Sequence, residues 1–258
     1  MINISLIVPC YNEYNRLPVT LKKIEDWLSI QKTFIVELVL ANDGSEDKTI
    51  ILLNNIKKRF EDKKICTVKV FDFEHRGYIE TLFDCYKKST NNILCNMEAD
   101  CSIHPKNFEY FSNFLDEFDM IQGSRILKQK NSKSFQNKGI IRSFLSIFYS
   151  YIFRFLFKSN ILDPQCGFKM IKKEKLIYCL KNIKLSHDGL KVTELTLRFH
   201  QNNFKIKEIP ILNQHNEDSR LIPNFSFLKP FPFLKVIMSN LLAIIELYYI
   251  LKKENLDR

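Results

Sequence analysis

Residues 34–45 read FIVELVLANDGS, and this stretch indicates how the chain folds. Residues 34–40 are rich in apolar and β-branched side chains, which is typical of a strand, and Asn42-Asp43-Gly44 then favours a tight turn. The carboxylate of Asp43 is therefore expected at the C-terminal edge of a strand. In open α/β sheets that edge binds ligands, because the turns there leave a crevice lined by loop side chains and helix N-termini.

The stretch at 93–97, ILCNM, repeats this arrangement and is followed by Glu98 and Asp100. Two carboxylates separated by one residue can both reach a divalent cation through oxygen. Mg²⁺ or Mn²⁺ usually completes its coordination shell with substrate phosphates. These residues therefore predict a nucleotide and metal site whose ligand is a diphosphate.

Apolar periodicity predicts that strands and helices alternate along the first half of the chain. Strands are expected near 3–8, 34–40, 67–73, 93–97 and 119–123, with helices near 17–30, 48–59, 78–89 and 106–117 between them. Such alternation predicts right-handed crossovers and a largely parallel sheet covered by helices on both faces. After residue 140, helices are expected near 142–158, 173–182 and 191–202, and a short strand at 204–209.

With 258 residues, the chain is long enough for one α/β domain with a sizeable core. We expect a catalytic domain at 1–222 and an apolar C-terminal segment at 223–258, set off by prolines at 223, 230 and 232. Residues 231–251 are strongly apolar but include Lys235 and Glu246, and charges are costly at the centre of a bilayer. This segment is therefore predicted to be an interfacial helix and not a membrane-spanning one.

The seven cysteines show no paired C-x-x-C and no zinc-like spacing, and no secretory leader precedes the first expected strand. A reducing, cytoplasmic location fits this pattern best. The net charge of +10 is unevenly distributed, because residues 120–162 hold eight basic side chains and no acidic ones. Within that block, 140–157 has apolar residues at helical spacing. It is either a basic amphipathic helix on an anionic membrane surface or a core helix. Nucleic-acid binding is not favoured, because no helix-turn-helix, zinc or aromatic RNP pattern accompanies the charge.

Three strings, VPCYNE at 8–13, NDGSEDKT at 42–49 and MEADCSIHP at 97–105, resemble in order and spacing the family 2 glycosyltransferases of GT-A fold. Within that family, GSR at 123–125, DPQCGFK at 163–169 and KEIP at 207–210 are similar to the dolichyl-phosphate mannose and glucose synthases and polyprenyl-phosphate glycosyltransferases. The resemblance covers about residues 3–222. It implies the α/β nucleotide-diphospho-sugar transferase fold.

The resemblance also implies roles for single residues. The nucleotide pocket would include Pro9, Tyr11, Glu13, Asp43 and Arg76, with Asp43 accepting hydrogen bonds from the base. Mg²⁺ or Mn²⁺ would be held by Glu98, Asp100 and Ser102, although the family usually has aspartate at the position of Glu98. The loop at 74–80 keeps Arg76-Gly77 but lacks the glycine-rich continuation common in relatives.

The catalytic residues implied are Asp100, Asp163 and Arg125, and the acceptor-phosphate candidates are Arg125, Arg142 and Arg220. The leading hypothesis is metal-dependent, inverting transfer of a hexose from a GDP- or UDP-linked sugar to a polyprenyl phosphate at the cytoplasmic membrane face. An alternative acceptor is a sugar hydroxyl of a cell-surface polysaccharide, which would need Asp163 as a base. Asp163 is otherwise a ligand contact or the cap of its turn. A third alternative is a non-catalytic, nucleotide-binding membrane protein.

Overall fold

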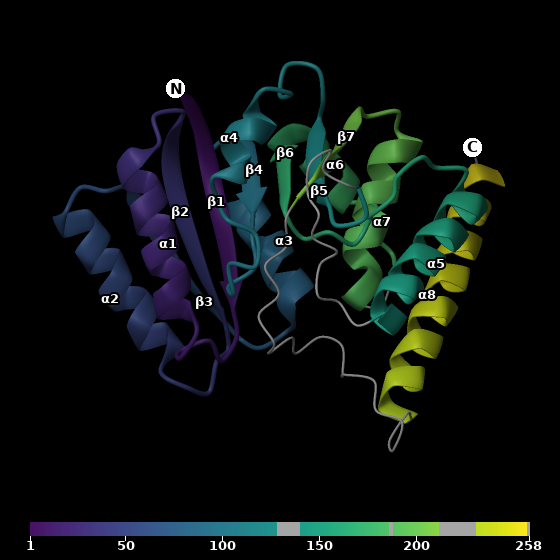
Figure 1. Ribbon diagram of the computed structural model, residues 1–258, viewed down its shortest axis with the longest axis horizontal. Helices are drawn as coiled ribbons and strands as arrows, with labels where there is room; N and C mark the ends of the chain where they lie inside the picture. The colour runs from purple at the N-terminus through teal and green to yellow at the C-terminus, as the bar shows by residue number, and fades with distance from the viewer. Residues whose placement is uncertain (128–139, 186–187, 212–230, 257–258) are drawn as a thin grey trace.

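The computed structural model describes residues 1–127, 140–185, 188–211 and 231–256. In this part of the chain seven strands form one sheet in the order β3-β2-β1-β4-β6-β5-β7 (Figure 1). The strands are β1 (Ile2–Cys10), β2 (Phe34–Asp43), β3 (Thr67–Phe73), β4 (Ile93–Asn96), β5 (Met120–Ser124), β6 (Lys169–Lys172) and β7 (Ile206–Pro210). All neighbouring pairs are parallel except those made by β6, which runs antiparallel to β4 and β5. The predicted mostly parallel sheet is confirmed.

Helices cover both faces of the sheet, as predicted. They are α1 (Leu17–Ile30), α2 (Thr49–Asp62), α3 (Tyr78–Lys88), α4 (Asn107–Ser112), α5 (Ile140–Phe157), α6 (Lys173–Leu180), α7 (Asp188–Gln201) and α8 (Phe231–Leu256). One face packs against α1, α2 and α4, and the other packs against α3, α6 and α7. Along β1, Leu6 and Val8 point to the first face while Ile7 points to the second, so both sides of the strand are buried.

The position of β1 determines where a ligand can bind. β1 pairs with β2 on one side and with β4 on the other, so the chain reverses its direction of winding at this strand. In doubly wound sheets the crevice lies at such a switch point, outside the carboxyl ends of the strands. The loops that follow β1, β2 and β4 therefore meet at one edge, and these loops carry the acidic motifs.

Two elements differ from the prediction. Strand β6 was not expected, because KMIK at 169–172 has only two apolar residues between lysines and no alternation long enough to indicate a strand. Its hydrogen bonds to β4 and β5 create it. Helix α4 ends at Ser112 instead of residue 117, since the following residues form successive turns.

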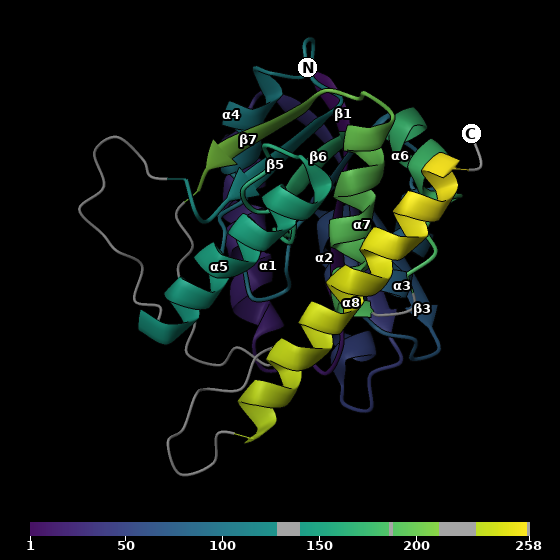
Figure 2. The same cartoon turned by 90° about the vertical axis from the view of Figure 1, so that its right-hand side faces the viewer.

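Helices α5 and α8 lie side by side at one end of the molecule (Figure 2). Phe153 of α5 and Ala243, Ile244, Leu247 and Leu251 of α8 form a buried cluster together with side chains of α7. On the outer sides of the same helices, two apolar stripes are exposed: Ile147, Phe148, Tyr151 and Phe155 on α5, and Met238, Leu242, Ile245 and Tyr249 on α8. Helix α5 thus has a core face and an exposed apolar face. Among the described residues, no helix combines the length and hydropathy needed to cross a membrane.

A buried ion pair joins α8 to the sheet-covering helix α7. Arg198 donates through Nε (3.1 Å) and Nη2 (2.8 Å) to Oε1 of Glu194, whose side chain is fully buried. Arg198 also donates to Glu254 of α8, with Nη2 to Oε1 at 3.1 Å. The Glu194 carboxylate further accepts the backbone N–H groups of Lys184 and Leu185. Glu194 therefore connects α7 to the backbone at residues 184 and 185 and to Arg198, which in turn binds α8.

Replacing Arg198 with methionine is expected to lower the free energy of unfolding by about 3 kcal/mol, because the carboxylate of Glu194 would stay buried without its cation. Urea unfolding followed by circular dichroism measures this change. Lys22→Met is the matched control, since Lys22 makes only an exposed pair with Asp26. If both substitutions lower the free energy of unfolding equally, the structural role of the Arg198–Glu194 pair would be contradicted.

Candidate active site

Asp43 organises the nucleotide end of the crevice. Its carboxylate is 2% exposed and accepts hydrogen bonds from the backbone N–H groups of Arg76 and Gly77, both at 3.0 Å, and from Thr81 Oγ1 at 2.7 Å. Nδ1 of His75 lies 3.1 Å from the same carboxylate. Asp43 thus holds the 75–77 loop over the end of β2. Its assignment to the nucleotide base stays a prediction.

The loop after β1 packs beside this anchor. The Tyr11 ring stacks on His75, with ring centroids 4.1 Å apart and planes 20° from parallel. The Glu13 backbone N–H donates to Thr49 Oγ1 at 2.9 Å, and Nε of Arg16 donates to the Glu13 carboxylate at 2.8 Å. Pro9 pairs in register with Ala41 just before the loop. The structure therefore brings Pro9, Tyr11, Glu13 and Asp43 together at one edge of the sheet.

Gly44 makes the close approach of these two loops possible. Its φ is +63°, and a Cβ at this position would lie 2.5 Å from the backbone nitrogen of His75. Any other residue would push the 75–77 loop away from Asp43. Arg76 contributes its backbone to that loop, while its guanidinium pairs with Asp84 at the surface.

The predicted metal ligands lie together after β4. The Ser102 N–H donates to Asp100 Oδ1 at 2.9 Å, and Ser102 Oγ donates to Glu98 Oε2 at 3.3 Å. Burial and the neighbouring charge of Asp100 both raise the pKa of Glu98 above its ordinary value. Two carboxylates held this close favour a cation between or beside them.

Gly167 lies close to the Glu98 carboxylate and the Tyr78 hydroxyl. A Cβ at Gly167 would lie 3.2 Å from Glu98 Oε1 and 3.5 Å from the Tyr78 hydroxyl oxygen, so only glycine leaves this position open. Among the described residues, no group of three or more His, Cys, Asp and Glu side chains is arranged to hold a metal on its own. The oxygen atoms of Glu98, Asp100 and Ser102 fit Mg²⁺ or Mn²⁺, which take oxygen ligands from substrate phosphates as well as from protein.

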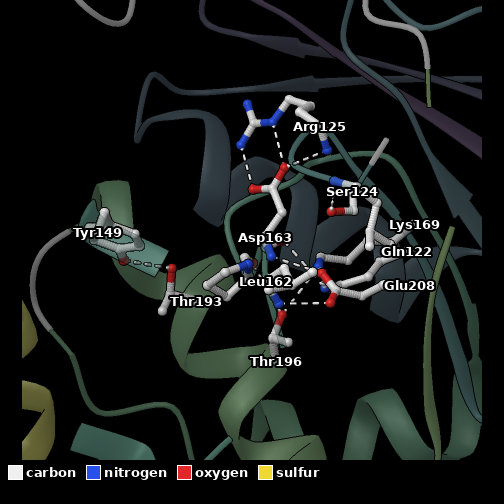
Figure 3. Close-up of polar contacts among 12 residues, drawn as sticks. Gln122, Ser124, Arg125, Tyr149, Leu162, Asp163, Lys169, Thr193, Thr196 and Glu208 are labelled. Atoms are coloured by element: carbon white, nitrogen blue, oxygen red, sulfur yellow. Dashed lines mark hydrogen bonds and ion pairs between the residues drawn. The ribbon is translucent and has the colours of Figure 1, made fainter. Parts of the chain in front are cut away.

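Arg125 and Asp163 form a paired unit (Figure 3), and the charges of both act on Glu98. Arg125 donates to the Asp163 carboxylate three times: through Nε at 2.8 Å, through Nη2 at 2.8 Å and through its backbone N–H at 2.9 Å. Burial opposes the charge on Arg125, but the Asp163 carboxylate outweighs it and raises the pKa of Arg125. The pair is fixed in one geometry, as two-pronged guanidinium–carboxylate contacts are.

A buried polar network supports this pair from below (Figure 3). Glu208 of β7 accepts the backbone N–H groups of Leu162 at 2.7 Å and Asp163 at 2.8 Å, and Gln122 Nε2 donates to the Asp163 carbonyl at 3.3 Å. The Lys169 ammonium donates to the Gln122 side-chain oxygen and, at 3.1 Å, to Thr196 Oγ1. The backbone and the side chain of Asp163 are therefore both held.

Sequence reasoning gave no role to Glu208 or Lys169, although both lie in strings that carry the family resemblance. Glu208 and Lys169 are 39 positions apart, so no local sequence pattern indicates that they belong to one network. The antiparallel strand β6, which positions Lys169, was itself not predicted. Of the other arginines, Arg142 lies in α5, where its side chain is outside the described part of the structure, and Arg220 lies outside the described residues. Their acceptor roles stay predictions.

A doubly wound sheet with acidic side chains at its switch point is the arrangement of the nucleotide-diphospho-sugar transferases of the GT-A type. The chain belongs to the glycosyl transferase family 2, whose family model matches residues 5–179. It is therefore a glycosyltransferase, and the prediction of family and enzyme class is confirmed.

Comparison with known proteins finds related sequences and folds. The chain is 23% identical over 235 residues to the dolichyl-phosphate beta-glucosyltransferase of Mus musculus, a match that covers 88% of this chain and 72% of that protein. The crystal structure of M. tuberculosis glucosyl-3-phosphoglycerate synthase with Mn²⁺, UDP-glucose and glycerol 3-phosphate matches with a TM-score of 0.56 at 13% identity, covering 83% of this chain and 73% of that one. The crystal structure of S. aureus TarS 1-349 in complex with UDP-GlcNAc matches with a TM-score of 0.54 at 16% identity. The match covers 92% of this chain and 65% of that one.

Lys169 leads to a prediction about pH. Burial lowers the pKa of Lys169 to about 8, from the 10.5 of an exposed lysine. Between these values the unfolded chain binds more protons than the folded one, so this group makes the folded state more stable as pH rises. Relative to Lys169→Met, the wild type is expected to gain about 2 kcal/mol in free energy of unfolding between pH 7 and 9.5.

Paired urea titrations across that pH range measure the gain. Lys175→Met is the control, because Lys175 lies outside the buried network, beside the exposed Glu174 and over the Phe204 ring, and its substitution is expected to leave the pH profile unchanged. A constant difference between wild type and Lys169→Met at all pH values would show that Lys169 does not lose its proton in this range.

Proposed function

We propose that this glycosyltransferase moves a hexose from a nucleotide diphosphate sugar to a polyprenyl phosphate, with inversion at the anomeric carbon, at the cytoplasmic face of a membrane. The observation that supports it best is the juxtaposition of Glu98 and Asp100 with the Arg125–Asp163 pair at the switch point of the sheet. The similarity to dolichyl-phosphate beta-glucosyltransferases supports glucose and a lipid phosphate as the first substrates to test.

The donor is proposed to bind along the edge that runs from Tyr11 and Asp43 to Glu98. Glu98, Asp100 and Ser102 would hold Mg²⁺ or Mn²⁺, which supplies positive charge to the leaving diphosphate. The charge that develops on the diphosphate is then met by a site whose ligands are already in place and cost little reorganisation. UDP-glucose is the first donor to test, because the two structural neighbours contain uridine nucleotides, and GDP sugars are the alternative.

The geometry of Asp163 favours a phosphate acceptor over a hydroxyl. Both of its carboxylate oxygens accept hydrogen bonds from Arg125, and such bonds stabilise the charged carboxylate and make it a poor proton acceptor. A phosphate oxygen is already anionic and needs positioning more than a base. None of the described residues accepts a hydrogen bond from Nη1 of Arg125. We propose that the two N–H groups of this nitrogen donate hydrogen bonds to the acceptor phosphate.

Helix α5 links this pair to the exposed apolar stripes. Tyr149 of α5 lies 3.3 Å, oxygen to oxygen, from Thr193 of α7, and its pKa responds to the charge of Asp163 after the larger effect of burial. The stripe at Ile147, Phe148, Tyr151 and Phe155 continues along the same helix. We propose that the isoprenoid tail and the membrane lie along α5 and α8, with the exposed Arg154 and Lys158 facing anionic lipid.

The decisive experiment measures radiolabel from a panel of UDP and GDP sugars in the organic phase after incubation with Mg²⁺ or Mn²⁺ and a polyprenyl phosphate. Label in the lipid phase from one donor is the expected result. Asp100→Asn is expected to lower this transfer at least about a hundredfold, because the site loses a charged ligand oxygen.

Arg125→Ala should abolish the transfer, whereas Asp163→Asn should retain part of it, because an amide oxygen still accepts from Arg125. The reverse order, with Asp163→Asn inactive and Arg125→Ala active on a sugar acceptor, would support the hydroxyl alternative. If the protein binds the nucleotide but only hydrolyses the nucleotide sugar, or transfers its sugar to neither acceptor, the proposed reaction would be contradicted.

Membrane attachment is tested with sedimentation of vesicles that contain about one third anionic lipid. The double variant Tyr151→Ser, Phe155→Ser is expected to bind at least about tenfold more weakly, because it removes two large apolar side chains from the stripe. Tyr110→Ser on α4 is the control, as Tyr110 is equally an exposed aromatic residue but lies outside both stripes. Equal sedimentation of both variants and the wild type would contradict attachment through α5.

A further inference from the structure

Tyr78 is the first residue of α3, and its hydroxyl reaches the predicted metal site. The preceding Gly77 has a φ of +98° and donates its N–H to Asp43, so the start of the helix is fixed at the edge of the sheet. The Tyr78 hydroxyl oxygen would lie 3.5 Å from a Cβ at Gly167, and that same Cβ would lie 3.2 Å from Glu98 Oε1. The hydroxyl and the carboxylate therefore both lie beside the position that Gly167 leaves without a side chain.

The Tyr78 hydroxyl is buried without a hydrogen-bond partner among the described residues. Leaving such a group unpaired usually costs about 1 to 3 kcal/mol, so native structures rarely do so without a reason. Burial, followed by the charges of Glu98, Cys166 and Asp100, raises the pKa of Tyr78 above its ordinary value. A tyrosine hydroxyl carries its proton at neutral pH and can donate a hydrogen bond.

A tyrosine nearby shows the usual arrangement. The Tyr86 hydroxyl, on the same helix and equally buried, donates to Asn96 Oδ1 at 2.8 Å. Asn96 in turn donates to the carbonyl of Gly167. Helix α3 therefore satisfies one buried hydroxyl within the protein and leaves the other, near Gly167, without a partner among the described residues.

We infer that the Tyr78 hydroxyl donates a hydrogen bond to an anionic oxygen of the donor's diphosphate. The inference rests on the proposed function and adds a donor-binding residue to it. The diphosphate is the chosen part of the donor because Glu98, one of the residues that would hold its cation, lies beside the same position at Gly167. A neutral donor suits this position, since it meets phosphate oxygen without adding charge to the cation site.

Tyr78→Phe tests the inference because it removes only the hydroxyl. Calorimetric titration with UDP and with GDP, in the presence of Mn²⁺, is expected to show about tenfold weaker binding for the nucleotide that the wild type binds. Thermal unfolding without nucleotide is expected to show an unchanged or higher midpoint, because the substitution removes an unpaired buried polar group.

Two controls separate binding from folding. Tyr86→Phe should lower the unfolding midpoint, because it leaves Asn96 Oδ1 without its donor, whereas Tyr178→Phe on the exposed side of α6 should change neither measurement. Gly167→Ala is a second test of the same space, and its methyl group is expected to weaken nucleotide binding.

Equal nucleotide affinity of Tyr78→Phe and wild type would overturn the inference while leaving the proposed function intact. A loss seen with the nucleotide sugar but not with the nucleotide would place the contact on the sugar and overturn the assignment to diphosphate. A clearly lowered unfolding midpoint of Tyr78→Phe would show that the hydroxyl has a structural partner. A wild-type protein that binds neither UDP nor GDP would instead refute the proposed function.

Discussion

The requirement that buried carboxylates be hydrogen-bonded shapes the whole carboxyl edge of this sheet. Asp43, Asp163 and Glu208 are each held by backbone N–H groups of a neighbouring loop, and each thereby fixes that loop in place. An unpaired charge at these depths would cost several kcal/mol, so each loop has few alternative positions. The acidic residues of the sheet edge are therefore a framework for the loops as well as candidate ligand contacts.

This framework has two levels. Below, Glu208, Gln122, Lys169 and Thr196 make a closed set of contacts between β5, β6, β7 and α7 (Figure 3). Above it, Arg125 and Asp163 hold each other, next to Glu98 and Asp100. Preorganisation of this kind lets a site stabilise developing charge without rearranging at the moment of reaction. The one buried hydroxyl that finds no partner in the described structure, that of Tyr78, lies near Gly167, as does the carboxylate of Glu98.

The helices α5 and α8 each have a buried apolar face and an exposed apolar face. Each buries one stripe in a shared cluster with α7 and leaves a second apolar stripe exposed, and the Arg198–Glu254 contact holds α8 to the domain. Helix α5 also carries Tyr149, whose hydroxyl contacts Thr193 of α7, so the helix with the exposed stripe is joined to a helix that covers the sheet. The alternatives of core helix and surface helix for residues 140–157 thus describe two faces of the same element.

Much of the fold was predictable because its signals are local. Apolar runs such as 34–40, turn residues such as Asn42-Asp43-Gly44 and the regular alternation of strands and helices indicated a parallel sheet, and the order of three motifs indicated the family. Glu98, Asp100 and Ser102 could be grouped because they are neighbours in sequence and follow a strand.

What only the tertiary structure decided depends on contacts between distant segments. Strand β6 exists because β4 and β5 offer it hydrogen bonds, and its own four residues carry no strand signal. The pairing of Arg125 with Asp163, the support of their loop by Glu208 and the burial of Lys169 each join residues more than 25 positions apart. The sequence by itself therefore determined the class of fold and the chemical types at its edge. Long-range packing determined which of these groups are satisfied by the protein and which face a ligand, because that outcome depends on burial, and burial is a property of the assembled chain.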